Sequence, residues 1–204
     1  MRRIITIGRE FGSGGRELGR WLSEKLQITY YDQEIMTEIS KRTSIPEEYV
    51  QQIEESRPIM SFPIQVGHSF YPISNQIFQQ SISIYTEQHK LLQELAAKSD
   101  CVIVGRCADF VLKDLNPVRI FVYADLESKI QRCMERRPEG ENLTEAQMKK
   151  KISEIDRGRA KYYEFFTRKT WGGRENYDLL INTSGENIET LANAVCGFVK
   201  SRFE

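Results

Sequence analysis

Short hydrophobic runs alternate along this chain with longer segments whose hydrophobic residues recur on one helical face. The runs predict buried strands, and they lie at residues 4–7, 28–31, 101–104, 119–123 and 177–182. The helical segments lie at residues 17–26, 34–43, 76–98, 126–137, 144–166 and 188–199. Because strands that alternate with helices favour parallel pairing with helices on both faces, we predict a three-layer α/β fold with a five-stranded, mainly parallel sheet. A length of 204 residues is typical of a single domain, here residues 1–204.

The segment from residue 44 to residue 74 is the least regular part of the chain. One short helical stretch covers residues 46–56, and the prolines that interrupt the segment are Pro46, Pro58, Pro63 and Pro72. We interpret the segment either as an insertion that covers a substrate or as a poorly packed excursion. The aromatic residues that indicate closure over an apolar group are Phe62, Phe70 and Tyr71. His68 is interpreted as an exposed loop histidine rather than a catalytic base.

A glycine-rich segment follows the first predicted strand. Glycine lets backbone N–H groups point inward, and the start of a helix adds free N–H groups and the positive end of its dipole. We therefore expect a phosphate-binding loop made of Gly12, Ser13, Gly14, Gly15, Arg16 and Glu17. The strict pattern G-x-x-x-x-G-K-[ST] is not met, since Gly15 or Arg16 stands at the lysine position, depending on the glycine that is aligned. A tight strand-to-helix turn without a ligand is the alternative interpretation.

Two charged residues come directly at the ends of predicted strands. Asp32 ends the second strand, and Arg106 follows the third. Ligands of open α/β sheets bind at this edge, and a guanidinium can hold a phosphate with two hydrogen bonds, so both residues are candidates for binding an acceptor. Asp32 could instead cap the following helix, and Arg106 could instead pair with Asp109.

Two charged helices, joined by a turn with Pro138 and Gly140, carry a group of arginines. The arginines are Arg132, Arg136, Arg137, Arg157 and Arg159. Such a group is typical of a lid that closes over a polyphosphate, and we place this lid at about residues 132–170. The alternative is a solvated helical hairpin held by pairs of glutamate and arginine.

Composition narrows the possible functions. Lys and Arg together number 29, as do Asp and Glu, so no overall charge directs the chain to nucleic acid or to a membrane. The four cysteines form no C-x-x-C pair and only two histidines accompany them, so we expect reduced, structural thiols and no protein-held metal. No stretch is long and apolar enough for a signal peptide or a membrane span, and we expect a cytoplasmic protein.

Several motifs occur in an order that resembles the cytidylate kinase-like group of P-loop kinases. They are GREFGSGGREL, YYDQEI, VGRCAD, RIFVY followed by a helix and RR, IDRGRAKYY and YDLLINTS. The resemblance implies a nucleoside monophosphate kinase fold with a core, a monophosphate-binding insertion at about residues 33–75 and an arginine-rich lid. It implies a phosphate loop over residues 12–17 and a monophosphate contact at Arg106. It also implies contacts of Asp156 and Arg159 with ribose and phosphate, and matches Arg136 and Arg137 to the double arginine at the start of the lid.

The expected reaction is transfer of the γ-phosphoryl group of ATP to a phosphate or hydroxyl acceptor, with a nucleoside monophosphate as the favoured acceptor and Mg²⁺ held chiefly by phosphates and water. Its candidate catalytic residues are Arg16, Arg106, Arg136, Arg137 and Arg159, while Asp32 and Asp156 would orient the acceptor. Val104 and Cys107 stand where cytidylate kinases have acids beside the Gly-Arg motif. A nucleotide-binding module without turnover is a second hypothesis. A dinucleotide enzyme that uses Asp32 on a ribose is a third, and the arginine-rich lid argues against it.

Overall fold

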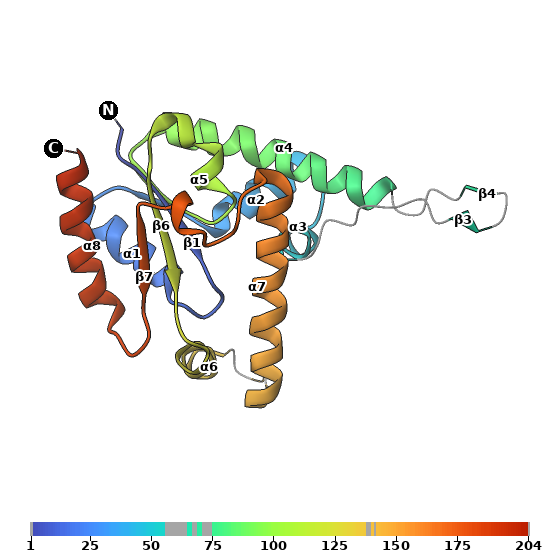
Figure 1. The fold of residues 1–204 in the computed structure, drawn as a ribbon. Helices are drawn as coiled ribbons and strands as arrows, with labels where there is room; N and C mark the ends of the chain where they lie inside the picture. The colour runs from blue at the N-terminus through green and yellow to red at the C-terminus, as the bar shows by residue number, and fades with distance from the viewer. Residues whose placement is uncertain are drawn as a thin grey trace.

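The computed structural model describes residues 2–55, 65–66, 69–70, 75–137, 140 and 142–203. At its centre is a five-stranded sheet in the order β2-β5-β1-β6-β7, and every neighbouring pair is parallel (Figure 1). The strands are β1 (Ile4–Arg9), β2 (Thr29–Tyr31), β5 (Cys101–Val104), β6 (Val118–Tyr123) and β7 (Leu179–Asn182). The five predicted strands are therefore confirmed. A separate antiparallel pair consists of β3 (Gln65–Val66) and β4 (Ser69–Phe70).

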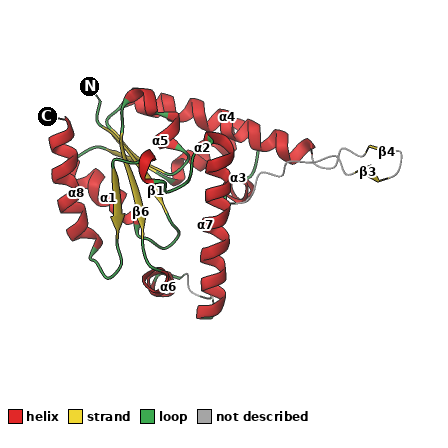
Figure 2. Cartoon of the chain, in the orientation of Figure 1, coloured by secondary structure: helices red, strands yellow, loops and turns green. Residues whose placement is uncertain are grey.

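Helices connect the strands of the central sheet (Figure 2). They are α1 (Gly15–Leu26), α2 (Gln33–Thr43), α3 (Glu47–Glu54), α4 (Asn75–Lys98), α5 (Ala108–Val111), α6 (Leu126–Glu135), α7 (Glu145–Thr167) and α8 (Ile188–Phe203). Two short 3₁₀ turns lie at Lys113–Leu115 and Arg174–Asn176. The sequence pattern did not predict α5, because four residues are too few to show a helical period.

The sheet separates two hydrophobic cores, as the alternation of side chains along a strand requires. On one face, Ile5 and Ile7 of β1 pack with leucines of α1 and with Val195 and Val199 of α8. On the other face, Ile4 packs with buried residues of α2, α3, α4, α5 and α7. The helices thus cover both faces, which confirms the three-layer arrangement (Figure 1).

The insertion predicted at residues 33–75 is described only in part. Its helices α2 and α3 pack on the core through Ile35, Ile39, Val50 and Ile53. Phe62, His68 and Tyr71 lie outside the described residues, and Phe70 falls in β4. The interpretations placed on these four residues therefore stay predictions.

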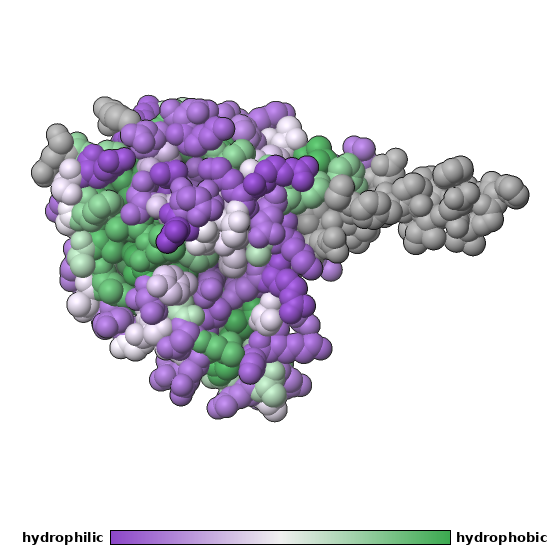
Figure 3. Space-filling view, in the orientation of Figure 1, coloured by the Kyte–Doolittle hydropathy of each residue, from purple (hydrophilic) through white to green (hydrophobic). Residues whose placement is uncertain are grey.

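The long helix α7 has a well-defined start. Thr144 accepts a hydrogen bond from the backbone N–H of Gln147, whose side chain in turn accepts one from the N–H of Thr144. This reciprocal capping box fixes the point at which the chain enters the predicted lid helix. On the side drawn in Figure 3, the surface over α7 is mainly hydrophilic, whereas hydrophobic residues gather near α8 and β7. Leu180 of β7 and Phe198 of α8 are exposed hydrophobic residues. In the part of the chain that the structure describes, no helix is long and apolar enough to cross a membrane.

Candidate active site

The predicted phosphate loop lies between the end of β1 and the start of α1. Gly12 and Gly14 have φ angles of 74° and 80°, which glycine adopts at low cost. Gly14 is the N-cap of α1, and no side chain among the described residues caps the first turn. Its backbone N–H groups are therefore free to bind an anion, which the helix dipole also favours.

Buried polar contacts hold the loop from behind. The Ser13 hydroxyl donates to the carbonyl of Glu10 at 2.9 Å, and the Thr183 hydroxyl donates to the carbonyl of Ser13 at 2.7 Å. Arg132 donates to the carbonyl of Gly12 at 2.7 Å and to that of Thr183 at 3.2 Å. The predicted lid residue Arg132 therefore joins α6 to the phosphate loop and to the end of β7.

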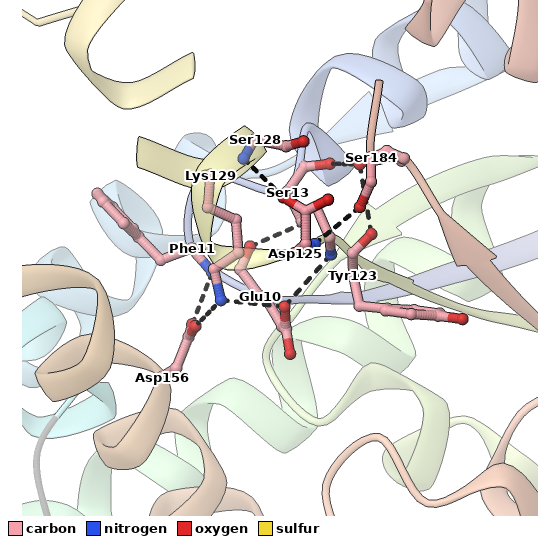
Figure 4. Close-up of polar contacts among 12 residues, drawn as sticks. Glu10, Phe11, Ser13, Tyr123, Asp125, Ser128, Lys129, Asp156 and Ser184 are labelled. Atoms are coloured by element: carbon pink, nitrogen blue, oxygen red, sulfur yellow. Dashed lines mark hydrogen bonds and ion pairs between the residues drawn. The ribbon is translucent and has the colours of Figure 1, made fainter. Parts of the chain in front are cut away.

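Lys129 of α6 lies in a buried network beside the loop (Figure 4). Its Nζ lies 2.6 Å from a carboxylate oxygen of Asp156 and 3.0 Å from one of Glu10. Asp156, on α7, also accepts a hydrogen bond of 2.6 Å from the backbone N–H of Phe11. The network connects the loop, α6 and α7, and it engages both oxygens of the carboxylate expected to orient an acceptor.

The loop, α6 and α7 line a cavity of about 370 Å³, which we call the donor cavity because the phosphate loop is expected to bind the phosphates of the donor. Its charged lining residues are Arg9, Glu10, Arg16, Glu17, Arg132, Arg136, Arg137, Lys151 and Arg159. Gly12, Gly14 and Gly15 also line it. Seven cationic side chains therefore face two carboxylates around the free N–H groups of α1, and this excess of positive charge suits a polyphosphate.

A second feature of the site begins where β5 ends. Gly105, Arg106 and Cys107 have φ angles of 80°, 62° and 52°, so three successive residues are left-handed. Such a conformation costs a non-glycine residue about 1–2 kcal/mol. The buried side chain of Gln88, on α4, donates a hydrogen bond of 2.7 Å to the carbonyl of Arg106 and supports this turn. The turn presents Arg106, which is only 7% exposed, at the carboxyl edge of the sheet.

Arg106 lines a smaller cavity of about 50 Å³, which we call the acceptor cavity because Arg106 is expected to bind the acceptor. Aromatic residues form one part of its wall: Tyr162, Tyr163, Trp171 and Tyr177. The predicted insertion contributes Met36, Gln51 and Glu55. Asp109 also lines the cavity, and its carboxylate accepts a hydrogen bond of 2.6 Å from Tyr163. Burial raises the pKa of Asp109 above its ordinary value.

Three arginines line both cavities: Arg9, Arg16 and Arg159. Arg159 donates a hydrogen bond of 2.7 Å to Glu55 and lies over the ring of Phe11, with 5.6 Å from its Cζ to the ring centroid. It therefore joins the predicted lid to the end of α3 and to the phosphate loop. A group bound at the boundary between the cavities would be within reach of all three guanidinium groups.

Arg16 and Asp32 form an ion pair of 2.9 Å. Asp32 occupies the N-cap position of α2 without capping it through its side chain, and that side chain is 3% exposed. The side chain of Arg16 is about half-exposed, and it lines the acceptor cavity while it pairs with Asp32. The structure thus brings these two predicted site residues together directly, which sequence spacing did not indicate.

The remaining predicted lid arginines are placed in different ways. Arg136 lines the donor cavity and forms an ion pair of 2.6 Å with Glu17. Arg137 lines the same cavity and is exposed. Arg157 is exposed and lines neither cavity. Arg136, Arg137 and Arg159 thus remain the candidates that extend from the predicted lid toward a nucleotide.

Burial strongly affects the basic groups at the boundary. It lowers the pKa of Arg9 well below its ordinary value, and the charge of Arg159 lowers it further. Burial also lowers the pKa of Arg106 to about 10, although the charge of Asp32 opposes the shift. A guanidinium stays protonated in proteins, so a bound anion would relieve the cost of holding these two positive charges together.

Sequence reasoning missed Arg9, Lys129 and Trp171. A signal for Arg9 is present, because it follows Gly8 at the end of a buried strand just as Arg106 follows Gly105. The register pairs Ile7 of β1 with Val104 of β5, so the two Gly-Arg pairs lie at matching positions on neighbouring strands. No local signal marks Lys129 or Trp171, since their partners lie far away in the sequence.

The carboxylates near the donor cavity determine how a magnesium ion could be held. No cluster of three histidine, cysteine, aspartate or glutamate side chains suited to a metal occurs within the described ranges. Glu10 and Glu17 line the cavity, and each already forms an ion pair. The residues present therefore fit a Mg²⁺ ion that is bound mainly by phosphate oxygens and water, which is a common arrangement for this ion.

The proteins that this chain is similar to agree with the fold described above. The family model described as the cytidylate kinase-like family matches residues 4–185, whereas a search of curated proteins found no match. An uncharacterized protein from Eubacterium ventriosum ATCC 27560 is 25% identical, with a TM-score of 0.71 and coverage of 98% of this chain and 99% of that chain. Shikimate kinase from Acinetobacter baumannii, in complex with shikimate, is 19% identical, with a TM-score of 0.55 and coverage of 99% and 94%. Deoxyadenosine kinase from M. mycoides is 14% identical, with a TM-score of 0.51 and coverage of 97% and 99%. These similarities confirm the predicted P-loop kinase fold.

Proposed function

We propose that this chain, which belongs to the cytidylate kinase-like family, is an ATP-dependent phosphotransferase whose favoured acceptor is a nucleoside monophosphate. The observation that carries the proposal is the boundary between the two cavities, which is lined by the same three arginines on both sides. A phosphoryl group that passes from a donor to an acceptor must cross such a boundary. Phosphoryl transfer depends mainly on positioning and on neutralisation of charge, and this arrangement supplies both.

On the donor side, the N–H groups at the start of α1 would bind the phosphates of ATP, together with Arg136 and Arg137. Arg137 is exposed and available, and Arg136 would exchange its pair with Glu17 for a phosphate. Bound Mg²⁺ would supply further neutralisation of the phosphate charge. Glu10 stays paired with Lys129 and keeps the loop in position.

On the acceptor side, Arg106 and Arg159 would bind the phosphate of the monophosphate, while Asp32 keeps Arg16 in position. An acceptor phosphate oxygen attacks the γ-phosphorus, a new P–O bond forms, and the bond to the oxygen that bridges the β- and γ-phosphates breaks to release ADP. The arginines stabilise the negative charge that is spread over the transferring group. Because the attacking oxygen is already anionic, the step needs no protein base.

The proposal is tested by incubating the protein with ATP and Mg²⁺ and a panel of nucleoside monophosphates, with the products identified by mass. We expect transfer to at least one monophosphate. Arg159→Ala should lower the rate of transfer by about 10²-fold, because it removes a hydrogen-bond donor that lies within reach of both substrates. Arg106→Lys should also lower it, because lysine cannot replace the two-pronged contact of a guanidinium.

Lys150→Ala is the matched control on α7. Lys150 is 75% exposed, pairs only loosely with Glu154 at 3.8 Å and lines neither cavity, so the rate should not change. Tight binding of ATP without transfer to any acceptor would contradict the proposed kinase activity. It would instead identify a nucleotide-binding module.

A further inference from the structure

Arg9 is placed by two glycines that lie far apart in the sequence. A Cβ atom added to Gly15 would lie 2.5 Å from the Cβ of Arg9 and 3.1 Å from its Cγ. A Cβ atom added to Gly105 would lie 2.8 Å from the Cζ of Arg9 and would overlap its Nη1. The side chain of Arg9 therefore passes over the first residue of α1 and ends against the turn that presents Arg106.

Gly15 is the residue that stands at the lysine position of the P-loop pattern when Gly14 is aligned with its second glycine. Its φ angle is not among the positive ones, so its backbone would accept a lysine. The aliphatic part of the Arg9 side chain occupies the space that a lysine at position 15 would need. The Cβ of Val122 would also lie 3.3 Å from a Cβ on Gly15. The P-loop lysine and Arg9 thus exclude each other in this fold.

Arg9 also has the electrostatic properties of a ligand-binding group. Among the described residues, no hydrogen bond or ion pair engages its guanidinium, although its pKa is lowered by burial and by the neighbouring charge of Arg159. It lines both the donor and the acceptor cavity. A charged group in such a position is stabilised when an anion binds at the boundary.

We infer that Arg9 takes the place of the missing P-loop lysine and binds the phosphoryl group that is transferred. The inference rests on the proposed function and assigns a catalytic residue to it. A lysine would extend from the first turn of α1, whereas Arg9 reaches the same region from the end of β1. Its planar guanidinium can donate two parallel hydrogen bonds to phosphate oxygens, which a lysine cannot do.

The test removes the guanidinium of Arg9 and introduces a lysine at position 15 in its place. Arg9→Gln keeps most of the bulk over both glycines but removes the charge, and Arg9→Gly also removes the Cβ atom that would lie 2.5 Å from a Cβ on Gly15. The double variant Arg9→Gly with Gly15→Lys then restores the lysine of the P-loop pattern. Phosphoryl transfer and the affinity for a non-hydrolysable ATP analogue are measured for each. Arg20→Ala is the control, because Arg20 is exposed on α1 and lines neither cavity.

We expect Arg9→Gln and Arg9→Gly to lower the transfer rate by about 10²-fold or more, and we expect Arg20→Ala to leave it unchanged. The double variant should transfer phosphate about tenfold or more faster than Arg9→Gly. Gly15→Lys alone should lose activity, because the lysine meets the side chain of Arg9. A loss without recovery in the double variant would show that Arg9 acts elsewhere and would overturn the inference.

Failure of this inference can be separated from failure of the proposed function. If the unmodified protein transfers phosphate and the Arg9 variants do so equally well, the inference is wrong and the proposed function stands. If the unmodified protein transfers phosphate to no acceptor, the proposed function fails, and binding of the ATP analogue decides the placement of Arg9. If Arg9→Gln binds the ATP analogue more weakly and the double variant regains affinity, the role assigned to Arg9 is supported. If the affinity of Arg9→Gln is unchanged, that role is overturned.

Discussion

At the scale of single residues, the two Gly-Arg pairs show that the place of an arginine in the fold determines whether it can bind a ligand. Arg9 ends β1, and Arg106 lies two residues beyond the end of the neighbouring parallel strand β5, at the carboxyl edge where open α/β sheets bind ligands. Gly105 is needed at its position both because its φ angle is 80° and because Arg9 lies against its Cα. The same charge on the surface of a helix, as in Arg157, is exposed and lines neither cavity.

Asp109 offers a prediction at this scale. Burial raises its pKa in the folded protein, so the folded state binds its proton more tightly than the unfolded state does. The free energy of unfolding therefore falls as the pH rises from the pKa of the unfolded state to that of the folded state, and the loss persists above both. Asp109→Asn keeps an acceptor for Tyr163 and removes the buried charge. We expect it to raise the free energy of unfolding at pH 8 by on the order of 1 kcal/mol.

The measurement is denaturant unfolding of both proteins from pH 4 to pH 8. The difference in the free energy of unfolding between Asp109→Asn and the unmodified protein should shrink as the pH is lowered toward 4, because the folded state then takes up the proton of Asp109. A difference that stays constant with pH would show that Asp109 is not the titrating group.

At the scale of elements, the contacts of Lys129 explain how the predicted lid is connected to the core. α6 and α7 pack on each other, and Lys129 joins both to the phosphate loop through Glu10 and Asp156. The side chain of Lys129 is only 9% exposed, so both carboxylates depend on it for neutralisation. Arg159 makes the corresponding connection from α7 to Glu55 at the end of α3.

Lys129→Ala should therefore destabilise the protein. Removing one member of a buried charge network leaves the others desolvated, which costs about 3–5 kcal/mol when the pair is fully buried. Because Glu10 is 27% exposed, we expect a loss of about 2–3 kcal/mol in the free energy of unfolding, measured in urea. Lys90→Ala removes an exposed pair with Glu87 and should cost less than about 1 kcal/mol. Equal losses in the two variants would mean that the network adds no stability beyond an ordinary surface pair.

At the scale of the whole molecule, charge is balanced overall but separated locally. The chain has equal numbers of acidic and basic residues, yet six arginines and one lysine line the donor cavity. The overall balance gives no general attraction to polyanions, so a site for an anion is expected where the fold concentrates the arginines. The sheet topology produces this concentration, because it brings the ends of β1 and β5 beside the start of α1.

Inorganic tripolyphosphate should therefore stabilise the folded protein. A ligand that binds only the folded state adds about 2.7 kcal/mol to the free energy of unfolding at a concentration about 100 times its Kd. We expect a rise in Tm with tripolyphosphate that sodium chloride at the same ionic strength does not reproduce. An equal rise with both salts would point to general screening rather than to a site.

The sequence by itself determined the alternation of strands and helices, and with it the fold class, because periodicity records which face of each element is buried. It also located the glycine loop and Arg106, since both lie at the boundary of a strand that is visible locally. Only the tertiary structure decided that Arg16 pairs with Asp32, that Lys129 bridges Glu10 and Asp156, and that Arg9 fills the space beside Gly15. Residues that are distant in the sequence meet in the Lys129 bridge and in the contact of Arg9 with Gly105. The Arg16–Asp32 pair depends on how α1 and β2 pack together. A local pattern carries no information about which distant side chain will occupy a given space, so these contacts could be seen only in the folded chain.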